Sequence, residues 1–572
     1  MKILGINHDM YISSAALIID GKVVAACAEE RLIRDKMTRV FPSKAIDFCL
    51  KKANINLNQV DYVANSYNPA VHFKKFHPIF SNYRRFRGDY FYSIPDFLLN
   101  RERNIKEDSD YTYQKVRLGK KELNIYYITH HLCHAANGFY ISPFKKSAIL
   151  TADGAGEDDT VNFLTGEKNN IKLIKRLKLP HSTGSFYSTF TDFFGYKPEH
   201  DEWKVMALSA YAKNNNKYYK IIKNMVNLKT EGSFELDQSY FKQVISGTPN
   251  FYTDKFVSSL GKAKNKNEKF NKKDFEIAAA MQRVFEDICS HMLKYLYKVS
   301  KTKNLVLSGG SFMNSVFNGK VDKLTPFNKV WLSSCPDDSG QSIGAALYLY
   351  NNILKHKKRY EMKHNFLGPS FKSEKIKEDL IKYKVKFNYI KDVAKVVSEE
   401  LAEGKLVGWF QGQMEFGQRA LGNRSILADP RKKSSKERVN KAVKYRENFR
   451  PFAPAILEEN AHEFFDLKKG EKIPFMEKVV LVKQQKRHLI PAVVHKDFTA
   501  RAQTVDRNTN KLFYDLINEF YKITGVPILL NTSFNLNGEP IVCSPTDAIR
   551  TFYSCGLDIL VMGNYIIQKW KN

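Results

Sequence analysis

A pattern of three apolar strands occurs twice within the first 180 residues, and it constrains the fold more than any other feature. Near the N-terminus, MKILGI, SSAALII and KVVAACAEE follow one another, and Asp20-Gly21 separates the last two. Asp-Gly between two apolar runs is typical of a two-residue hairpin turn, so we expect three consecutive strands. A helix is predicted next, from Pro42-Ser43 through KAIDFCLKKA.

The same succession begins again at KSAILTADG, which is predicted to be a strand that ends in an acidic loop. DTVNFL is predicted as the second strand, Gly166 as the turn and IKLIKRL as the third strand. Two such units indicate an internal duplication with weak sequence identity, the arrangement that actin-like ATPase and ribonuclease-H-like folds repeat. In those folds the turn after each first strand faces a bound phosphate or metal. Periodicity alone fits other α/β arrangements as well.

The length of the chain predicts more than one domain, because 572 residues exceed what a single hydrophobic core accommodates. The stretch HKKRYEMKHNFLGPSF is charged, contains Gly-Pro and lies between blocks with clear periodicity. We therefore expect a first α/β domain over residues 1–355, a linker over 356–371 and a second α/β domain over 372–572.

Composition excludes some classes of protein. No apolar run approaches the ~18 residues of a membrane span, and Asn7, His8 and Asp9 interrupt the N-terminal apolar run. The seven cysteines are scattered without a CxxC pair, which indicates reduced thiols in a cytoplasmic protein. The formal net charge of +31 permits nucleic-acid or anionic partners. Because no nucleic-acid motif is present, we favour a lysine-rich solvated surface, and nucleic acid is not an expected partner.

Residues 73–106 combine five Lys or Arg side chains with seven aromatic ones. Such a segment could bind sugars, a phosphorylated acceptor or single-stranded nucleic acid. The alternative is a helical insertion whose aromatic residues pack on the body of the protein and whose cations face water.

HHLCHAANGFY, residues 130–140, places His130 and His134 four residues apart, on one face of a helix. Such a pair often caps a helix or forms hydrogen bonds, so alone it does not establish a metal site. Asp153 and Asp338 lie in glycine-flanked loops after predicted strands, where side chains converge on ligands. Together the four residues suit iron(II), manganese or zinc better than magnesium or calcium. His131 points elsewhere at helical spacing and is left out of the set.

Two glycine-rich turns precede predicted helices, SGGSFMN with Gly309, Gly310 and Asn314, and DSGQSIGAA at 338–346. Backbone N–H groups at such positions can form phosphate cradles. The C-terminal part carries cations that match phosphate oxygens, and Asn531, Thr532 and Ser533 follow the apolar strand ITGVPILL. A nucleoside polyphosphate site explains this excess of cations better than structural salt bridges do. The cations are Arg419, Arg424, Lys444, Arg446, Arg450 and Arg501.

Taken in order, the motifs resemble the NodU/CmcH-type O-carbamoyltransferases of nodulation-factor and antibiotic biosynthesis, over nearly the whole chain. The resemblance rests on SAALIIDGKVVAACAEER, HHLCHAANGFY, ADGAGE, EWKVMALSAYA, LSGGSFMN, DSGQSIGAA, EFGQRALGNRSILADPR, FRPFAP, ARAQTV and NTSFNLNGEPIV. It implies a duplicated actin-like N-terminal domain, similar to tRNA threonylcarbamoyltransferases, and a YrdC-like α/β C-terminal domain.

The resemblance further implies an ATP-dependent O-carbamoyltransferase. The C-terminal domain would make carbamoyl adenylate from carbamoyl phosphate and ATP, with magnesium. The intermediate would then pass inside the protein to a metal site that delivers the carbamoyl group to a hydroxyl of a sugar, glycan or natural product. By motif, the metal ligands are His130, His134, Asp153 and Asp338; the transfer-site nucleotide contacts are Gly309, Gly310 and Asn314; the adenylation site comprises Arg419, Lys444, Arg450, Arg501, Asn531 and Ser533.

Two departures from the family pattern affect these expectations. The family usually has His-Asp directly before Ser-Ala-Ala of the second strand, and that histidine is the expected general base. In NHDMYISSAAL the pair His8-Asp9 comes several residues earlier, so either a rebuilt loop brings His8 to the acceptor or another group is the base. Gln418 stands where proline is common, which loosens that turn without changing its chemistry.

Two other functions fit parts of the sequence. A tRNA threonylcarbamoyl-type modification enzyme would explain the positive charge, but no tRNA-binding appendage is evident. A non-catalytic nucleotide-binding protein would not need the complete metal set. We therefore expect the protein to be an enzyme, the ATP-dependent O-carbamoyltransferase. A homodimer is the default expectation for its assembly.

Overall fold

The structure is a computed structural model that describes residues 1–8, 12–73, 109–119, 121–242, 250–444, 447 and 449–569. The chain forms two compact units, each described here by itself. The first contains residues 1–26 and 39–362, and the second contains residues 27–38 and 363–572.

The first sheet of the first unit begins with the predicted hairpin strands β1 (Lys2–Asn7), β2 (Ser14–Ile19) and β3 (Lys22–Ala28). Parallel to β1 lies β4 (Tyr62–Asn65), followed by β6 (Lys121–Ile128) and β5 (Tyr111–Leu118). The strand order is therefore β3-β2-β1-β4-β6-β5. Leu4 and Ile6 pack under α2 (Ser43–Lys52), on one face of this sheet.

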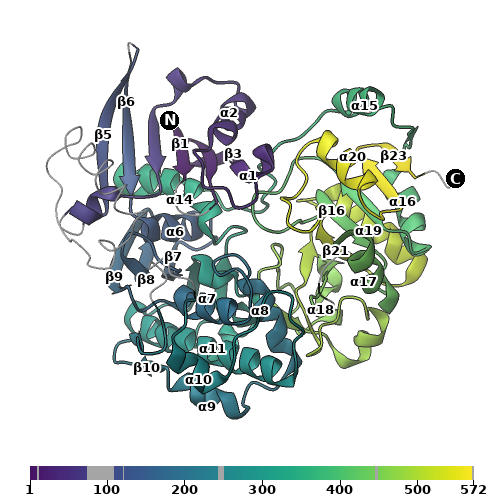
Figure 1. Cartoon of the computed structure of the whole chain (residues 1–572). Coiled ribbons are helices and arrows are strands. Elements are labelled where there is room, and N and C mark those ends of the chain that lie inside the picture. Colours follow the sequence, from purple (N-terminus) through teal and green to yellow (C-terminus); the bar gives the residue numbers. More distant parts are fainter. Residues whose placement is uncertain are drawn as a thin grey trace. The chain divides into compact units, whose positions relative to one another are not determined.

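The second sheet repeats this order. The strands β7 (Lys146–Ala152), β8 (Asp159–Glu167) and β9 (Asn170–Lys178) form the antiparallel half, and β12 (Asn304–Ser308) and β13 (Lys329–Leu332) continue it in parallel. The order β9-β8-β7-β12-β13 matches β3-β2-β1-β4-β6, which confirms the predicted duplication and α/β class (Figure 1).

One turn prediction in this sheet is wrong. Gly166 lies inside β8, paired with Ile171, and the chain reverses at Lys168-Asn169, where Lys168 has φ 56°. The strand therefore runs beyond DTVNFL through TGE, since the sheet pairing continues past the glycine.

The remaining elements of the first unit are mainly helices. The long helix α11 begins at an Asn271–Asp274 capping box and packs against α7, α8 and α9. The helices are α6 (His130–Phe139), α7 (Thr183–Phe193), α8 (Glu202–Leu208), α9 (Lys217–Lys223), α10 (Asp254–Leu260), α11 (Lys272–Ser300), α12 (Ser315–Asn318), α13 (Val321–Leu324) and α14 (Gln341–Leu347); the shorter elements are η1 (Leu57–Gln59), η2 (Pro69–Phe73), η4 (Ser209–Tyr211), β10 (Val226–Leu228), β11 (Phe234–Leu236), η6 (Gly310–Met313), η7 (Asp338–Gly340) and η8 (Tyr348–Ile353).

Glycines let α14 pack closely against both α6 and the first hairpin. A Cβ at Gly344 would lie 1.9 Å from the backbone oxygen of Cys133 in α6, and a Cβ at Gly5 in β1 would lie 1.8 Å from that of Ser342. The hydroxyl of Ser14 in β2 also donates to the carbonyl of Ser339. Figure 1 shows α14 between β1 and α6. This contact brings the start of α14 close to the histidines of α6.

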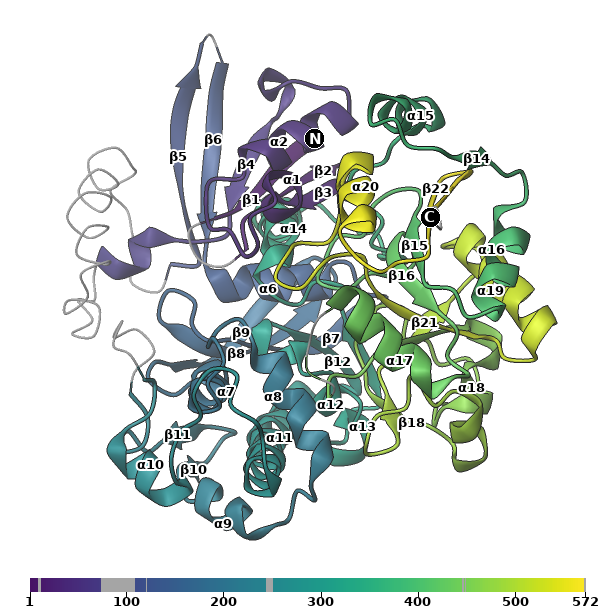
Figure 2. The ribbon, with the colours of Figure 1, turned by 45° about the vertical axis from the view of Figure 1, so that its right-hand side comes forward.

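The second unit is an α/β fold on one eight-stranded mixed sheet, in agreement with the sequence (Figure 2). Alternate residues of its strands face opposite cores, so that Trp409 packs toward α16 and α19 while Phe410 packs toward α15, α17 and α20. The sheet order is β14 (Asn388–Tyr389), β23 (Tyr565–Gln568), β22 (Ile559–Met562), β15 (Val407–Phe410), β16 (Arg424–Ala428), β21 (Ile528–Ser533), β17 (Ala453–Leu457) and β20 (Gln503–Val505). The other elements are α15 (Ser373–Lys382), α16 (Val393–Ala402), α17 (Lys433–Val439), η9 (Asn440–Lys444), η10 (Glu458–Asn460), α18 (Ala461–Phe464), β18 (Val480–Leu481), η11 (Gln484–Leu489), β19 (Thr499–Ala500), α19 (Lys511–Thr524) and α20 (Pro545–Tyr553).

An N-terminal segment, residues 27–38, completes the second unit, which the sequence did not indicate. It contains the short helix α1 (Glu29–Ile33), and Leu32 packs against Met414, Ala420, Ile541 and Cys543. The stretch 356–371, expected to be a linker, contributes to both units: the Met362 N–H donates to the Ile141 carbonyl, and the Asn365 amide donates to the Phe416 carbonyl.

We expect Arg34→Met to lower the free energy of unfolding by about 2 kcal/mol, because it removes charge-assisted hydrogen bonds from a partly buried site. The guanidinium donates to the carbonyls of Ile541 (2.6 Å) and Pro540 (2.7 Å) and lies 3.6 Å from Asp547. Urea unfolding followed by circular dichroism measures the change. Asp35→Ala, at an exposed position of the same segment, is the control and should change stability by less than ~0.5 kcal/mol.

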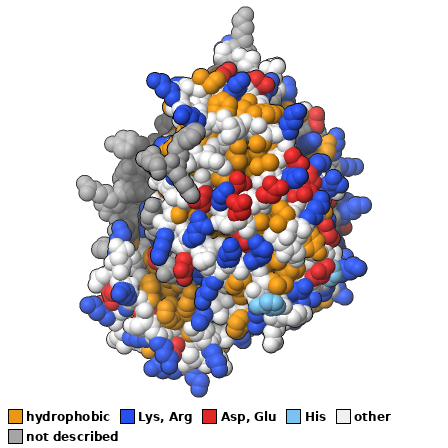
Figure 3. Space-filling view, turned by 90° about the vertical axis from the view of Figure 1, so that its right-hand side faces the viewer, with side chains coloured by type: hydrophobic (Ala, Val, Ile, Leu, Met, Phe, Trp, Pro, Cys, Tyr) orange, Lys and Arg blue, Asp and Glu red, His pale blue; other side chains and the backbone are white. Residues whose placement is uncertain are grey.

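None of the helices in the described part of the chain combines the length and the apolar character needed to cross a membrane. Lys and Arg side chains are spread over the face shown in Figure 3, with acidic and hydrophobic side chains between them.

Candidate metal centre and cation cluster

The helix α6 begins at His130, and a buried carboxylate caps its N-terminus. Glu157 accepts hydrogen bonds from the N–H of His130 (3.1 and 3.2 Å) and from the N–H of Asn68 (2.8 Å). Burial raises the pKa of Glu157 to about 7. A negative charge at the N-terminus of a helix also interacts favourably with the helix dipole, so Glu157 holds the first turn of α6 in place.

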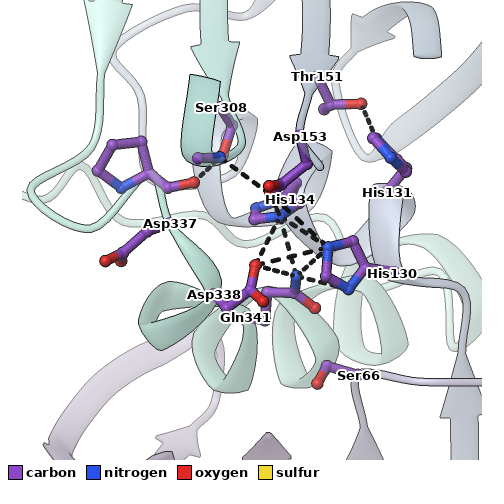
Figure 4. A network of polar contacts seen from close by, with 12 residues as sticks. Ser66, His130, His131, His134, Thr151, Asp153, Ser308, Asp337, Asp338 and Gln341 are labelled. Carbon is purple, nitrogen blue, oxygen red and sulfur yellow. Dashed lines mark hydrogen bonds and ion pairs between the residues drawn. The ribbon is translucent and has the colours of Figure 1, made fainter. Parts of the chain in front are cut away.

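His130, His134, Asp153 and Asp338 converge at one point, and one ligand atom from each lies within 4.8 Å of the others (Figure 4). Asp153 follows β7, and Asp338 starts η7. The Nε2 atom of His134 lies 3.1 Å from Nε2 of His130, 2.9 Å from Oδ2 of Asp153 and 3.3 Å from Oδ1 of Asp338. Both histidines are fully buried. The sequence grouped these four residues, and the fold brings them together.

The electrostatics of the cluster couple the histidines to the carboxylates. Burial acts to lower the pKa of His134, but the hydrogen bonds and charges of Asp153 and Asp338 outweigh it and raise the pKa to about 9. Burial acts to raise the pKa of Asp153, yet His130 and His134 hold it well below its ordinary value. Only neutral imidazole binds a metal, so a metal ion entering this site displaces a proton. Two imidazoles and two carboxylates at these separations fit a divalent first-row transition metal.

His131 lies outside this cluster, as expected. Its Nδ1 lies 2.8 Å from the Thr151 hydroxyl and its Nε2 lies 3.0 Å from the Asp159 carbonyl. Burial, first, and the neighbouring histidines lower its pKa well below the ordinary value.

The Gly309-Gly310 turn orients Asp153. The Gly310 N–H donates to Oδ2 of Asp153 (2.9 Å), and the Gly154 N–H donates to Oδ1 (2.7 Å). Gly309 has φ 103°, and a Cβ there would lie 2.2 Å from the carbonyl oxygen of Ala152. The turn therefore fixes a carboxylate of the cluster, while its contact with a nucleotide stays a prediction.

We expect Gly309→Ala to destabilise the first unit by more than ~2 kcal/mol, because alanine disfavours this φ and its Cβ would overlap the backbone of Ala152. Urea unfolding measures the loss. Gly154→Ala is the matched control, since no atom lies within 4 Å of a Cβ at that position. Equal stability of the two variants would contradict the prediction.

Two other predicted residues of the first unit have partners within the protein. The Asn314 side chain caps α12 and exchanges hydrogen bonds with Gln282 (2.9 and 3.1 Å), so its role as a nucleotide contact stays a prediction. His8 follows β1, and its Nε2 lies 3.0 Å from the amide nitrogen of Asn65 at the end of β4. Residues 9–11 lie outside the described part, so the role of His8 as general base is not tested.

Lys444 is the centre of a polar cluster in the second unit. Its buried ammonium group donates to the Ser533 carbonyl (2.6 Å), the Asn535 carbonyl (2.9 Å) and the Asn535 side-chain oxygen (2.7 Å), and lies 3.3 Å from the Ser533 hydroxyl. Asn535 was not singled out in the sequence, although it lies in the same NTSFNLNG motif.

Asn531 lies in β21, two residues before Ser533. Its amide nitrogen donates to Gln503 (2.9 Å) and to the Ala420 carbonyl (3.2 Å), so it connects β21 to the Arg419 loop. The carbonyl of Gly417 in that loop accepts a hydrogen bond from Arg31 (3.1 Å).

The remaining predicted cations lie on other loops. Arg450 pairs with Glu447 (3.3 Å). Burial, first, and the charges of Arg501 and Lys436 lower the pKa of His495 to about 3. Arg446 and residues 74–108, which contain nearly all of the basic-aromatic segment, lie outside the described residues.

Arg424 does not belong to an anion site, contrary to the expectation from sequence. Its guanidinium is fully buried, stacks on Phe410 at 3.7 Å and donates to backbone carbonyls that include Gln411 and Pro369. Burial lowers its pKa to about 10. Backbone carbonyls around the end of β15 therefore accept the hydrogen bonds that Arg424 could otherwise donate to an anion.

Comparison with known protein families decides the identity of the chain. The family model described as Carbamoyltransferase N-terminus matches residues 2–347, and that described as Carbamoyltransferase C-terminus matches residues 398–569. The chain belongs to the carbamoyltransferase family. It is therefore an enzyme that transfers carbamoyl groups.

Relatives match this carbamoyltransferase over nearly its full length. Nodulation protein NolNO of Sinorhizobium fredii is 35% identical over 98% of the chain and 80% of its own length. The uncharacterized protein MJ1051 of Methanocaldococcus jannaschii is 33% identical over the whole of both chains. Among solved structures, the activator of the 2-hydroxyisocaproyl-CoA dehydratase from Clostridium difficile with bound ADPNP has a TM-score of 0.31 and 14% identity, and covers 61% of this chain and 94% of its own.

Proposed function

We propose that this carbamoyltransferase is an ATP-dependent O-carbamoyltransferase with two reaction sites. In the second unit, water hydrolyses carbamoyl phosphate to carbamate and phosphate, and an oxygen of the carbamate attacks the α-phosphorus of ATP. This forms carbamoyl adenylate and releases pyrophosphate. In the first unit, a hydroxyl of a sugar, glycan or natural product attacks the carbamoyl carbon, and AMP leaves.

The polar cluster around Lys444 supports the first reaction. The ammonium group of Lys444 is held by oxygens of Ser533 and Asn535, so its position is fixed before any substrate binds. Preorganised cations stabilise negative charge that develops on departing phosphates, because they need not reorganise during the reaction. Arg419, Arg450 and Arg501 would contribute further positive charge, and Asn531 and Ser533 polar contacts, in the same unit.

The convergence of His130, His134, Asp153 and Asp338 is the observation that carries the second reaction. These residues would hold iron(II), manganese(II) or zinc(II). When bound, such an ion supplies Lewis-acid chemistry to the phosphate or carbonyl oxygen of the intermediate. The Gly309-Gly310 turn holds the Asp153 carboxylate through the N–H of Gly310, and Asn314 would lie at the nucleotide. His8 is our candidate for removing the proton of the acceptor hydroxyl.

Three further parts of the proposal concern the cellular compartment, the recognition of the acceptor and the metal that accompanies ATP. All seven cysteines are buried free thiols, which fits a reducing compartment, so we place the enzyme in the cytoplasm. The acceptor would be recognised in part by the basic-aromatic segment 73–106, and magnesium would accompany ATP as a co-substrate.

The deciding experiment measures pyrophosphate release from ATP with and without carbamoyl phosphate, followed by carbamoylation of a panel of sugars and aminocyclitols. We expect release that depends on carbamoyl phosphate and at least one carbamoylated hydroxyl. Absence of carbamoyl-phosphate-dependent release would refute the adenylation step.

A further inference from the structure

A fifth side chain, Gln341, reaches the metal cluster. Gln341 begins α14, three residues after Asp338, so the two side chains lie on the same face of a helical turn. The residue is fully buried, and Figure 4 shows its carboxamide pointing at His130 and His134. The sequence analysis did not single out Gln341, although it lies in the DSGQSIGAA motif that also contains Asp338.

The distances place the carboxamide among the ligand atoms. Its nitrogen lies 2.9 Å from both Nε2 and Nδ1 of His130, 2.9 Å from Nε2 of His134 and 3.2 Å from Oδ1 of Asp338. Donor atoms that each lie ~2.1 Å from one metal ion are separated by about 3.0 Å at right angles and about 3.4 Å at tetrahedral angles. The separations therefore match those of donors that share a metal ion. A side chain that only hydrogen-bonds one metal ligand, on the side away from the metal, would not lie this close to the ligand atoms of three residues.

The oxygen of the same carboxamide has no hydrogen-bond donor among the described residues. Oε1 of Gln341 is buried, and no described group donates a hydrogen bond to it. A buried carbonyl oxygen without a donor is unfavourable. Half a turn about the last side-chain bond exchanges the oxygen and the nitrogen, because the two ends of a carboxamide have nearly the same shape. In that orientation the oxygen, a good metal ligand, points where the four other donor atoms point.

We propose that Gln341 is a fifth protein ligand of the metal centre, bound through its side-chain oxygen. This inference rests on the proposed function, since it takes the four-residue centre as given. Two imidazole nitrogens and three oxygens favour iron(II) or manganese(II), which accept five or six ligands, over zinc(II), which prefers four. Gln341 thereby selects the metal.

The test uses the full-length protein with manganese(II) as the probe. Gln341→Met keeps the length of the side chain and removes both polar atoms, whereas Gln341→Glu keeps an oxygen. Asn137→Ala is the control, because it removes another buried carboxamide from α6, one that donates to the Ser333 hydroxyl and the Cys335 carbonyl rather than to a ligand of the cluster. Chelator competition gives the affinity, and water-proton relaxation counts the water molecules on the bound ion.

We expect Gln341→Met to weaken manganese binding at least tenfold. Loss of a residue that only hydrogen-bonds a metal ligand already weakens binding about 10-fold to 100-fold, and loss of a ligand should have at least that effect. We also expect it to add one water molecule to the ion. Gln341→Glu and Asn137→Ala should keep the water count of the wild type. Weaker binding of Gln341→Met with an unchanged water count would show that Gln341 only supports its neighbours, and unchanged affinity would also overturn the proposal. If the wild type binds none of manganese(II), iron(II) and zinc(II), the four-residue centre and the proposed function fail together.

Discussion

His130→Ala is expected to lower carbamoyl transfer to the acceptor at least ~100-fold while pyrophosphate release from ATP continues. The imidazole is fully buried and lies within 3.5 Å of both His134 and Asp338, so its loss removes a donor that no solvent-exposed group can replace. In the proposed mechanism, adenylate formation uses residues of the second unit and would not depend on this side chain. Parallel assays of pyrophosphate and of carbamoylated product separate the two reactions.

The matched control is His131→Ala, in the same turn of α6. His131 is equally buried but contacts Thr151 and the Asp159 carbonyl. This variant should lose stability and retain transfer below its unfolding temperature. Loss of pyrophosphate release in His130→Ala would contradict the division of the reaction between two sites.

Lys444→Met is expected to impair the other reaction and lower carbamoyl-phosphate-dependent pyrophosphate release by about 100-fold or more. The substitution keeps most of the length and removes the charge that Ser533 and Asn535 hold in place. Product formation should fall in proportion, because transfer depends on the adenylate. Initial rates of pyrophosphate release at saturating ATP measure the effect.

Lys441→Met is the control for this variant. Lys441 lies in the same short helical element η9, and its side chain is exposed, so its loss should leave the rate nearly unchanged. An equal fall in both variants would show that the cluster responds to net charge rather than to the position of Lys444. Mixing Lys444→Met with His130→Ala should not restore transfer if the adenylate stays within one protein molecule.

Local patterns in the sequence determined much of the architecture. The Asp20-Gly21 hairpin, the apolar runs of β1 and β2 and the second set of strands after residue 146 predicted the duplicated α/β unit. The spacing of His130 and His134 predicted two imidazoles on one helical face, because 3.6 residues per turn is a local property of the backbone. Gly166 misled because a glycine inside a pairing strand carries the same local signal as one in a turn.

Only the tertiary structure decided which of the candidate side chains are available for chemistry. Arg424 and Lys444 are equivalent cations in the sequence, yet the fold treats them differently: Arg424 is fully buried, stacks on Phe410 and donates to backbone carbonyls, whereas Lys444 also contacts the side-chain oxygens of Ser533 and Asn535. Gln341 became a candidate ligand because glycines at positions 5 and 344 let α14 approach β1 and α6, which brings its first turn against His130. The assignment of residues 27–38 to the second unit depends likewise on contacts with residues more than 350 positions away. Burial and close approach between distant segments arise only when the chain is packed, and no local spacing encodes them.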